Sequence, residues 1–223
     1  MSMHTPLGHL FPRSRHPATT RGHTLAAPHF YELFADVFFL GRRRATFQHL
    51  IAAASVQTGQ RVLDVACGTG YFARMLARAV GPPGEVIGID ASPEMISFAS
   101  RKAARLGNCT FQVGTAESLE FTADEFDVVV SSLAMHHLPD DLQIVALREM
   151  GRVLRPGGTL LVADAQMPRR GLPRLITVIT GHAHMARVTP HLDALARQAE
   201  FTDVCGGEAP PWLQYVRAVK AQA

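Results

Sequence analysis

Short apolar runs alternate with amphipathic stretches through the central part of the chain. The runs have the length of buried strands, and the stretches between them repeat hydrophobic residues at helical spacing. The runs that predict strands cover residues 61–66, 85–90, 109–113, 126–131 and 159–164. The stretches that predict helices cover residues 71–80, 93–106 and 139–154, and the second of these begins with Ser92 as N-cap and Pro93 at its first position.

This alternation predicts an α/β fold with a doubly wound sheet, because consecutive parallel strands need a crossover that a helix supplies. Residues 191–199 then predict a further helix, and residues 201–206 and 212–219 predict two late strands. About five residues separate these last two strands, too few for a crossover helix, so we expect an antiparallel hairpin. The pattern therefore predicts a mostly parallel, seven-stranded sheet with a C-terminal antiparallel hairpin.

An N-terminal helical cap is predicted for residues 28–57, ahead of the first strand. Its first helix carries hydrophobic residues at helical spacing, namely Phe30, Phe34, Val37 and Phe38. A second helix is expected over about residues 43–55, with Gly41 as the break between the two. Residues 1–27 lack acidic side chains and are rich in Pro, Arg, His and Thr, so we expect a disordered basic tail; an organelle transit peptide is the less favoured alternative. Residues 58–223 then form the main domain.

Composition indicates a soluble, cytoplasmic protein. Of the 223 residues, 47% are hydrophobic and 18% charged, and no apolar run approaches the length of a membrane span. Three widely separated cysteines form neither a disulfide framework nor a metal-binding cluster, which fits a reducing compartment. The net charge of +3 comes from residues 1–44, where six arginines face two acidic residues, so the remainder is close to −1. A nucleic-acid-binding face is therefore not expected on the main domain.

The first predicted strand leads into a glycine-rich turn in the stretch "VLDVACGTGYFARMLA". Gly68-x-Gly70-x-x-Ala73 fits a dinucleotide-binding fingerprint, since such a turn presents backbone N–H groups and a helix N-terminus to an anion. Asp64, however, stands four residues before the first of these glycines, where it would repel a diphosphate. A ligand with an ammonium group near the turn suits this aspartate better than NAD does.

Asp90 ends the second predicted strand, 20 residues after Gly70. A carboxylate there is placed to accept hydrogen bonds from both hydroxyls of a ribose. Asp64 and Asp90 together indicate a ligand with an amino acid at one end and a nucleoside at the other, which describes S-adenosylmethionine.

Five segments resemble, in order, the motifs of the class I S-adenosylmethionine-dependent methyltransferases, which share a Rossmann-like fold. They are "VLDVACGTG", "VIGIDASPEMI", "GTAESLEF", "FDVVVSSLAMHHLPD" and "REMGRVLRPGGTLLVAD", covering roughly residues 60–165. The chain is most similar to the small-molecule branch that includes the C-methyltransferases of ubiquinone and menaquinone biosynthesis. The resemblance implies in-line transfer of a methyl group to a small, hydrophobic or aromatic acceptor.

The resemblance also implies roles for individual residues. Asp64, Gly68 and Gly70 would hold the methionine end, Asp90 the ribose, and Ala91 and Met95 would flank the adenine. Ala116 and Glu117 would meet the adenine edge, Ser131 would face the sulfonium through its backbone, and Tyr31 would close the pocket. Two departures bear on the site: Ala66 replaces a frequent glycine, and Thr115 replaces an aspartate that often binds the adenine amino group.

Histidines after the fourth strand are the candidate bases for an acceptor that must lose a proton. His136 and His137 follow the strand at the edge of the sheet where ligands bind, and imidazole titrates near neutral pH. We expect His136 to be the substrate-side residue, because adjacent side chains on an extended segment point in opposite directions. The alternative is that this histidine only packs and caps backbone groups.

Residues 165–190 are a candidate lid over the acceptor, with a packed surface helix as the alternative. His182 and His184 are not expected to bind a metal, since no carboxylate or thiolate lies close by. Arg42, Arg43 and Arg44 are either solvated or within reach of an anionic group.

Alternative functions remain from three classes. A methyltransferase of RNA or protein is disfavoured by the near-neutral main domain and by the lack of an Asn-Pro-Pro-aromatic motif after the fourth strand. An NAD-dependent oxidoreductase is disfavoured by Asp64 and by the terminal hairpin. A protein that binds S-adenosylmethionine without transferring methyl is not excluded by the sequence.

Overall fold

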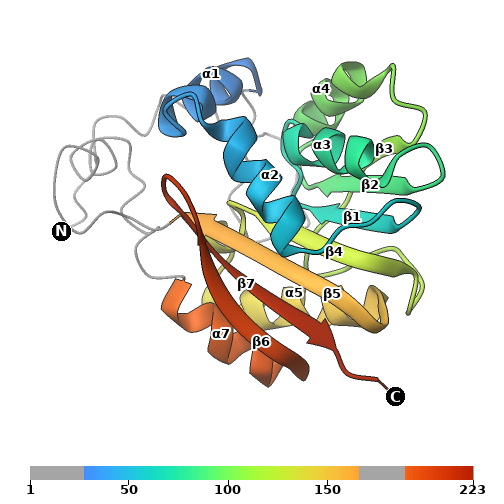
Figure 1. Cartoon of the computed structure of the whole chain (residues 1–223), viewed down its shortest axis with the longest axis vertical. Coiled ribbons are helices and arrows are strands. Elements are labelled where there is room, and N and C mark those ends of the chain that lie inside the picture. Colours follow the sequence, from blue (N-terminus) through green and yellow to red (C-terminus); the bar gives the residue numbers. More distant parts are fainter. Residues whose placement is uncertain (1–27, 166–188, 223) are drawn as a thin grey trace, which may run out of the picture.

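A computed structural model describes residues 28–165 and 189–222, and a seven-stranded sheet forms its centre (Figure 1). The strand order is β3-β2-β1-β4-β5-β7-β6. The strands are β1 Arg61–Val65, β2 Glu85–Asp90, β3 Cys109–Val113, β4 Phe126–Ser132, β5 Leu154–Ala165, β6 Phe201–Ala209 and β7 Leu213–Lys220. This order confirms the predicted doubly wound, Rossmann-like sheet.

Strands β1 to β5 are parallel, and β7 runs antiparallel to both of its neighbours. β1 lies between β2 and β4, so Asp64 is opposite Gly88 on one side and Val130 on the other. The turn between β6 and β7 spans only residues 210–212, which confirms the predicted hairpin. The order in which the strands are added to the sheet reverses between β1 and β4, and the carboxyl ends of these two parallel strands form the crevice where ligands bind in such folds.

Helices cover both faces of the sheet. The helices are α1 Pro28–Phe38, α2 Arg43–Ala53, α3 Tyr71–Val80, α4 Pro93–Ala103, α5 Asp140–Val153 and α7 Thr189–Gln198, with a short 3₁₀ turn at Met135–His137. One hydrophobic cluster joins the sheet to α2 and α3 through Phe47, Leu50 and Leu76. A second cluster joins the other face to α5 and α7 through Leu147 and Leu192.

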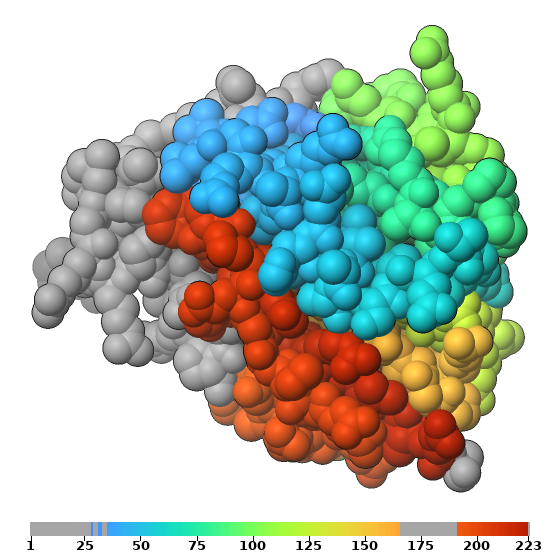
Figure 2. Space-filling model, viewed as in Figure 1, coloured from blue at the N-terminus to red at the C-terminus, as the bar shows by residue number. Residues whose placement is uncertain are grey.

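The two N-terminal helices pack onto the main core. Ala35 and Phe39 from the α1 end belong to the same hydrophobic cluster as the sheet residues beneath them. The Thr46 hydroxyl in α2 also donates a hydrogen bond to the backbone carbonyl of Pro210, in the β6–β7 turn. The space-filling view shows these segments side by side on one face (Figure 2).

Three element boundaries differ from the prediction by three residues or more: the start of β5, the end of α4, and the end of β6, which continues to Ala209 rather than to residue 206. β5 begins at Leu154, the predicted last residue of the preceding helix, rather than at residue 159, because Leu154 pairs with Phe126 and a register shift follows. Gly157 has a φ of +75°, which lets the strand continue through this irregularity. α4 ends at Ala103 rather than near residue 106, whereas its predicted start is confirmed by a hydrogen bond from the Met95 N–H to the Ser92 hydroxyl.

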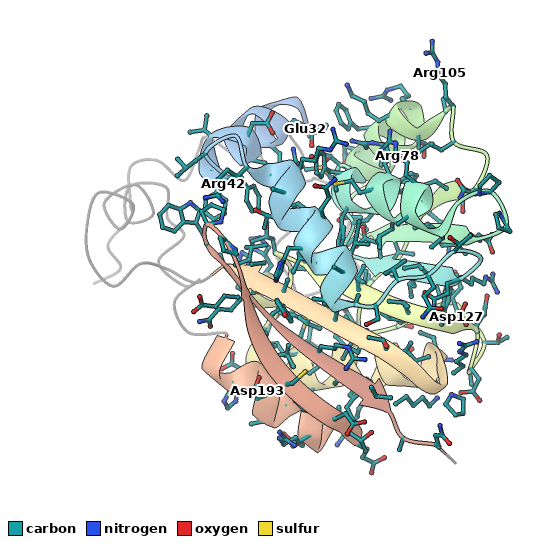
Figure 3. The ribbon with its side chains drawn as sticks, viewed as in Figure 1. Glu32, Arg42, Arg78, Arg105, Asp127 and Asp193 are labelled. Atoms are coloured by element: carbon teal, nitrogen blue, oxygen red, sulfur yellow. The ribbon has the colours of Figure 1, made fainter. Side chains whose placement is uncertain are left out.

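The expected basic tail and most of the candidate lid, including His182 and His184, lie outside the described residues. Within the described ranges, no helix is long and apolar enough to cross a membrane. Charged side chains such as those of Arg78 and Arg105 lie on the outer surface of the helical layer (Figure 3).

Candidate active site

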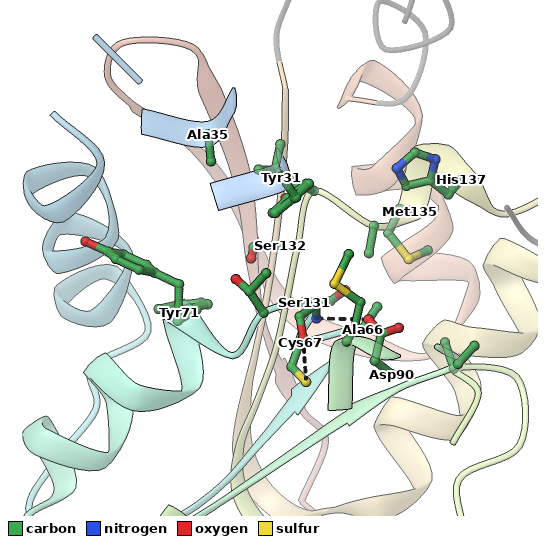
Figure 4. Close-up of a pocket in the computed structure, with 18 of the residues that line it drawn as sticks. Tyr31, Ala35, Ala66, Cys67, Tyr71, Asp90, Ser131, Ser132, Met135 and His137 are labelled. Atoms are coloured by element: carbon green, nitrogen blue, oxygen red, sulfur yellow. Dashed lines mark hydrogen bonds between the residues drawn. The ribbon is translucent and has the colours of Figure 1, made fainter. Parts of the chain in front are cut away.

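A cavity opens at the carboxyl ends of β1, β2 and β4 and is covered by α1 (Figure 4). Tyr31 and Ala35 of α1 lie on one side of it, and Asp90 and Cys67 lie on the other. The predicted site residues that line it are Tyr31, Gly68, Asp90, Ala91, Met95, Ala116, Glu117 and Ser131. Residues from segments far apart in the sequence therefore meet at one place, and the cavity is the candidate active site.

The backbone of the glycine-rich turn adopts positive φ angles, which are unfavourable for residues that carry a side chain. Gly68 and Gly70 have φ angles of +53° and +69°. A Cβ atom on Gly70 would lie 2.7 Å from the Phe111 ring and 2.8 Å from the Ala99 methyl group, so a side chain there would clash. Ala66 also has a positive φ, +58°, a conformation that costs a non-glycine residue about 1 kcal/mol. The turn is thus held in a strained shape, as is frequent at ligand sites.

Asp90 is fixed at the floor of the cavity by two backbone donors. The Gly68 N–H donates to Oδ2 and the Ser92 N–H donates to Oδ1, each at 2.9 Å. Burial raises the pKa of Asp90, and the two backbone hydrogen bonds oppose that shift. Each carboxylate oxygen keeps a further lone pair, so a ligand with two adjacent hydroxyl groups matches this residue.

Asp64 lies behind the turn and does not line the cavity, in contrast to the position expected from the sequence. Its residue is 1% exposed, and neither carboxylate oxygen has a hydrogen bond of standard geometry among the described residues. Burial raises its pKa to about 8; the nearby Ala73 N–H in the first turn of α3 lowers it by less. A cation bound on the other side of the turn would favour the ionised form. The direct contact of Asp64 with a ligand stays a prediction.

Two buried oxygen atoms of residues that line the cavity have no hydrogen-bond partner among the described residues. They are the Ser131 hydroxyl oxygen and Oε2 of Glu117. Thr115 lines the cavity beside Ala116. Buried polar atoms normally find partners, so these atoms indicate a ligand that carries hydrogen-bond donors.

A polar contact joins α1 to the glycine-rich turn. Oε1 of Glu32 accepts hydrogen bonds from the Thr69 hydroxyl and from the Arg43 guanidinium. The Arg43 guanidinium also lies 3.7 Å from the centre of the Tyr71 ring. Burial raises the pKa of Tyr31, which lies beside this contact, and the Arg43 charge lowers it by less.

The sequence did not distinguish Arg43 from its neighbours. Arg42 and Arg44 are exposed, as expected for solvated arginines, whereas Arg43 is buried and lines the cavity. The available signal was helical spacing, because Arg43 shares the buried face of α2 with Phe47 and Leu50. Its Nε and Nη1 atoms have no hydrogen-bond partner among the described residues.

The side chains of His136 and His137 are oriented differently from the prediction, which placed His136 on the cavity side. His137 lines the cavity, whereas the His136 side chain is 4% exposed and is not part of the lining. Nδ1 of His136 lies 2.6 Å from Oδ1 of Asp164, at the end of β5, and the two imidazole centres are 3.9 Å apart. The pair sits in a 3₁₀ turn rather than in an extended segment, so alternation along a strand does not apply. His137, and not His136, is therefore the histidine that faces the cavity.

Comparison with known proteins finds sequence similarity to methyltransferases. Residues 62–158 match the family described as a methyltransferase domain. A demethylmenaquinone methyltransferase of Halalkalibacterium halodurans is 36% identical over 140 residues, and one of Staphylococcus carnosus is 33% identical over 138 residues. Each match covers 62% of this chain and 56% of the relative, so the chain spans about half the length of the curated relatives it matches.

The fold has counterparts among solved structures. A SAM-dependent methyltransferase from Aquifex aeolicus superposes with a TM-score of 0.67 at 21% identity. The superposition covers 78% of this chain and 89% of that one. The two proteins thus share the fold described above.

Proposed function

We propose that this chain is a class I methyltransferase, which transfers a methyl group from S-adenosylmethionine to a small, apolar ring compound such as a quinol; the match of residues 62–158 to a methyltransferase domain supports this. The observation that carries the proposal is the position of Asp90, whose carboxylate is fixed against the Gly68 backbone at the floor of the cavity. The name of the curated relatives supports the class of acceptor.

The polar atoms of the cavity fit S-adenosylmethionine group by group. Asp90 would accept from the ribose hydroxyls, and Glu117 or the backbone at Ala116 would meet the adenine edge. Asp64 would attract the ammonium group from behind the turn. Arg43 would bind the carboxylate through Nε, which has no hydrogen-bond partner among the described residues, and through Nη1, which lies 3.5 Å from Oδ1 of Asp36. A dinucleotide would bring a diphosphate to this turn in place of the ammonium, so its binding is disfavoured.

The acceptor would bind on the apolar side of the cavity, beneath α1. Phe39, Leu133, Met135 and Leu138 are the apolar lining residues that would contact it, and Ser131 and His137 belong to the same lining. Apolar walls suit a planar hydrophobic ring and exclude water, which protects a methyl transfer from competing hydrolysis. Tyr31 would close the remaining opening from α1.

Methyl transfer depends mainly on the alignment of the methyl group with the acceptor atom. Bound cofactor would supply an electrophilic methyl group, and transfer in line to a nucleophile needs no covalent enzyme intermediate. His137 would take the proton of a phenol or enol acceptor, since imidazole is half-ionised near neutral pH. His136, held by Asp164, would fix the position of the His137 ring.

The proposal is tested by incubating the protein with S-adenosylmethionine that carries a labelled methyl group and with a short-chain naphthoquinol. Label is expected in the organic extract, in an amount that grows with enzyme concentration. Transfer of label to tRNA or to protein, with none to the quinol or to related phenols, would replace the small-molecule assignment by the macromolecular one.

A further inference from the structure

The end of α1 and the turn that follows it expose two large apolar side chains. Val37 is 66% exposed and Leu40 is 64% exposed, and we call this pair the apolar tip. Leu40 also has a φ of +51°, a left-handed conformation that is unfavourable for leucine. Its neighbour Phe39 is buried and supplies the contact with the core, whereas the Leu40 side chain is directed to the surface.

A basic groove lies between α2 and α3, and its lining begins at Arg44, four residues along the chain from Leu40. Arg44 of α2 and Arg74 and Arg78 of α3 line it, together with apolar and neutral polar residues and no acidic residue. Burial, with the charges of Arg43 and Arg78, lowers the pKa of Arg74, and the charge of Glu32 opposes that shift. Arg42 adds an exposed charge next to the tip, and Asp36 is the exposed acidic residue on the same turn. Arg42 and Arg78 are both labelled in Figure 3.

We propose that the apolar tip and the basic groove dock the protein onto the surface of an anionic lipid bilayer. Apolar side chains flanked by arginines suit the boundary between headgroups and acyl chains, where the arginines meet lipid phosphates. Charge complementarity favours this occupant over a second copy of the chain, whose groove would carry the same positive charge.

Docking through the apolar tip would bring the acceptor site close to the bilayer. This part of the inference rests on the proposed function. Ala35 and Phe39 line the cavity from the same end of α1 that carries Val37 and Leu40. A bilayer held against this turn would lie next to the cover of the acceptor site, so an apolar ring compound dissolved in lipid would reach the cavity through the α1 side.

The chain contains a natural reporter for docking. Trp212 is its one tryptophan and lies in the β6–β7 turn. The Thr46–Pro210 hydrogen bond holds this turn against the first turns of α2. Binding to vesicles that contain a brominated lipid should quench Trp212 fluorescence.

Binding of the full chain to membranes is measured by sedimentation with vesicles of phosphatidylcholine alone or of phosphatidylcholine with phosphatidylglycerol. Binding is expected only to the anionic vesicles. Val37→Ser with Leu40→Asn should weaken it at least roughly tenfold, because two apolar groups are lost. Asn tolerates the left-handed backbone at position 40, so the fold is preserved. Arg44→Gln should weaken binding roughly fivefold, the effect of one basic residue near the surface.

Helix α5, on the opposite face of the sheet, supplies the matched controls Val145→Ser and Arg148→Gln, both at exposed positions. Each should bind vesicles like the parent. Failure of the parent to bind, or equal losses in the tip and α5 variants, would overturn the proposal. A parent dimer that the tip substitutions make monomeric would also overturn it, in favour of a homotypic interface. Affinity for S-adenosylmethionine is measured without vesicles, so failure of the proposed function is recognised separately.

Discussion

Asp164 holds His136 through two hydrogen bonds, one to the ring and one to the backbone. Nδ1 of His136 lies 2.6 Å from Oδ1 of Asp164, and the His136 N–H donates to Oδ2 at 3.1 Å. Oδ1 accepts a further bond from the Ala165 N–H. One buried carboxylate thus fixes the turn that carries both histidines, and joins the end of β5 to the segment after β4.

Replacing this carboxylate should loosen the turn. Asp164→Ala leaves two backbone donors and an imidazole without their acceptor, and we expect a loss of about 3 kcal/mol in unfolding free energy. Urea denaturation measures the change. Asp193→Ala, at an exposed carboxylate on α7, is the control and should change stability by less than about 0.5 kcal/mol. Equal stability of the two variants would show that the contact does not hold the turn.

His137 should act in turnover and not in cofactor binding. We expect His137→Ala to lower kcat about a hundredfold, within the range of general-base catalysis, with the Kd for S-adenosylmethionine within twofold of the parent. His136→Ala should have the smaller effect on kcat, because that residue lies behind the cavity lining. A larger loss in His136→Ala, or an unchanged pH profile in His137→Ala, would contradict the assignment.

Asp64 should make the stability of the free protein depend on pH. Its folded-state pKa is about 8 against an ordinary value of 3.8, so between these values the folded protein holds a proton that the unfolded chain has lost. Stability from this group is therefore present at low pH and is lost as the pH rises towards 8. Asp64→Asn mimics the protonated form, so it should lose this part of the pH dependence and be more stable than the parent at pH 8.

Denaturation curves at pH 5 to 9 measure the difference. Binding of S-adenosylmethionine at pH 7 should also release a proton from the parent, which titration calorimetry in buffers of different ionisation enthalpy detects. Parallel pH profiles for the parent and Asp64→Asn would contradict the buried, protonated state of Asp64.

Alanine substitutions at Gly59 and Gly70 distinguish the cost of backbone strain from the cost of a steric clash. Both have positive φ angles, but a Cβ atom would clash with Phe111 and Ala99 only at Gly70. Gly59→Ala should cost about 1 kcal/mol from strain alone, whereas Gly70→Ala should cost about 1–3 kcal/mol more and lower cofactor affinity. Thermal unfolding compares them, and equal losses would mean that the Gly70 turn has room to adjust.

The fold was largely predictable because each buried strand and each amphipathic helix follows its own period in the sequence. The exception at Leu154 has a physical reason. Pro156, Gly157 and Gly158 have the composition of a turn, and only pairing with β4 across a register shift keeps this segment in the sheet. Local composition does not contain that long-range pairing.

The site was predictable where a motif fixes a residue to a strand end, as for Asp90 and the glycine-rich turn. It was not predictable where packing decides the direction of a side chain. Arg43 and His137 each stand next to a chemically identical neighbour, and only the helical face of α2 and the 3₁₀ turn after β4 select the one that lines the cavity.

The central claim is that Asp90 seats the ribose of S-adenosylmethionine. Titration calorimetry of the parent, of Asp90→Asn and of the exposed-site control Asp193→Asn tests it most directly, with NADH as the comparison ligand. The parent and the control should bind S-adenosylmethionine with micromolar Kd, and Asp90→Asn at least tenfold more weakly, the equivalent of about 1.4 kcal/mol of charge-assisted hydrogen bonding. None of the three should bind NADH. Equal affinity of Asp90→Asn and the parent, or NADH binding in place of S-adenosylmethionine, would contradict the account.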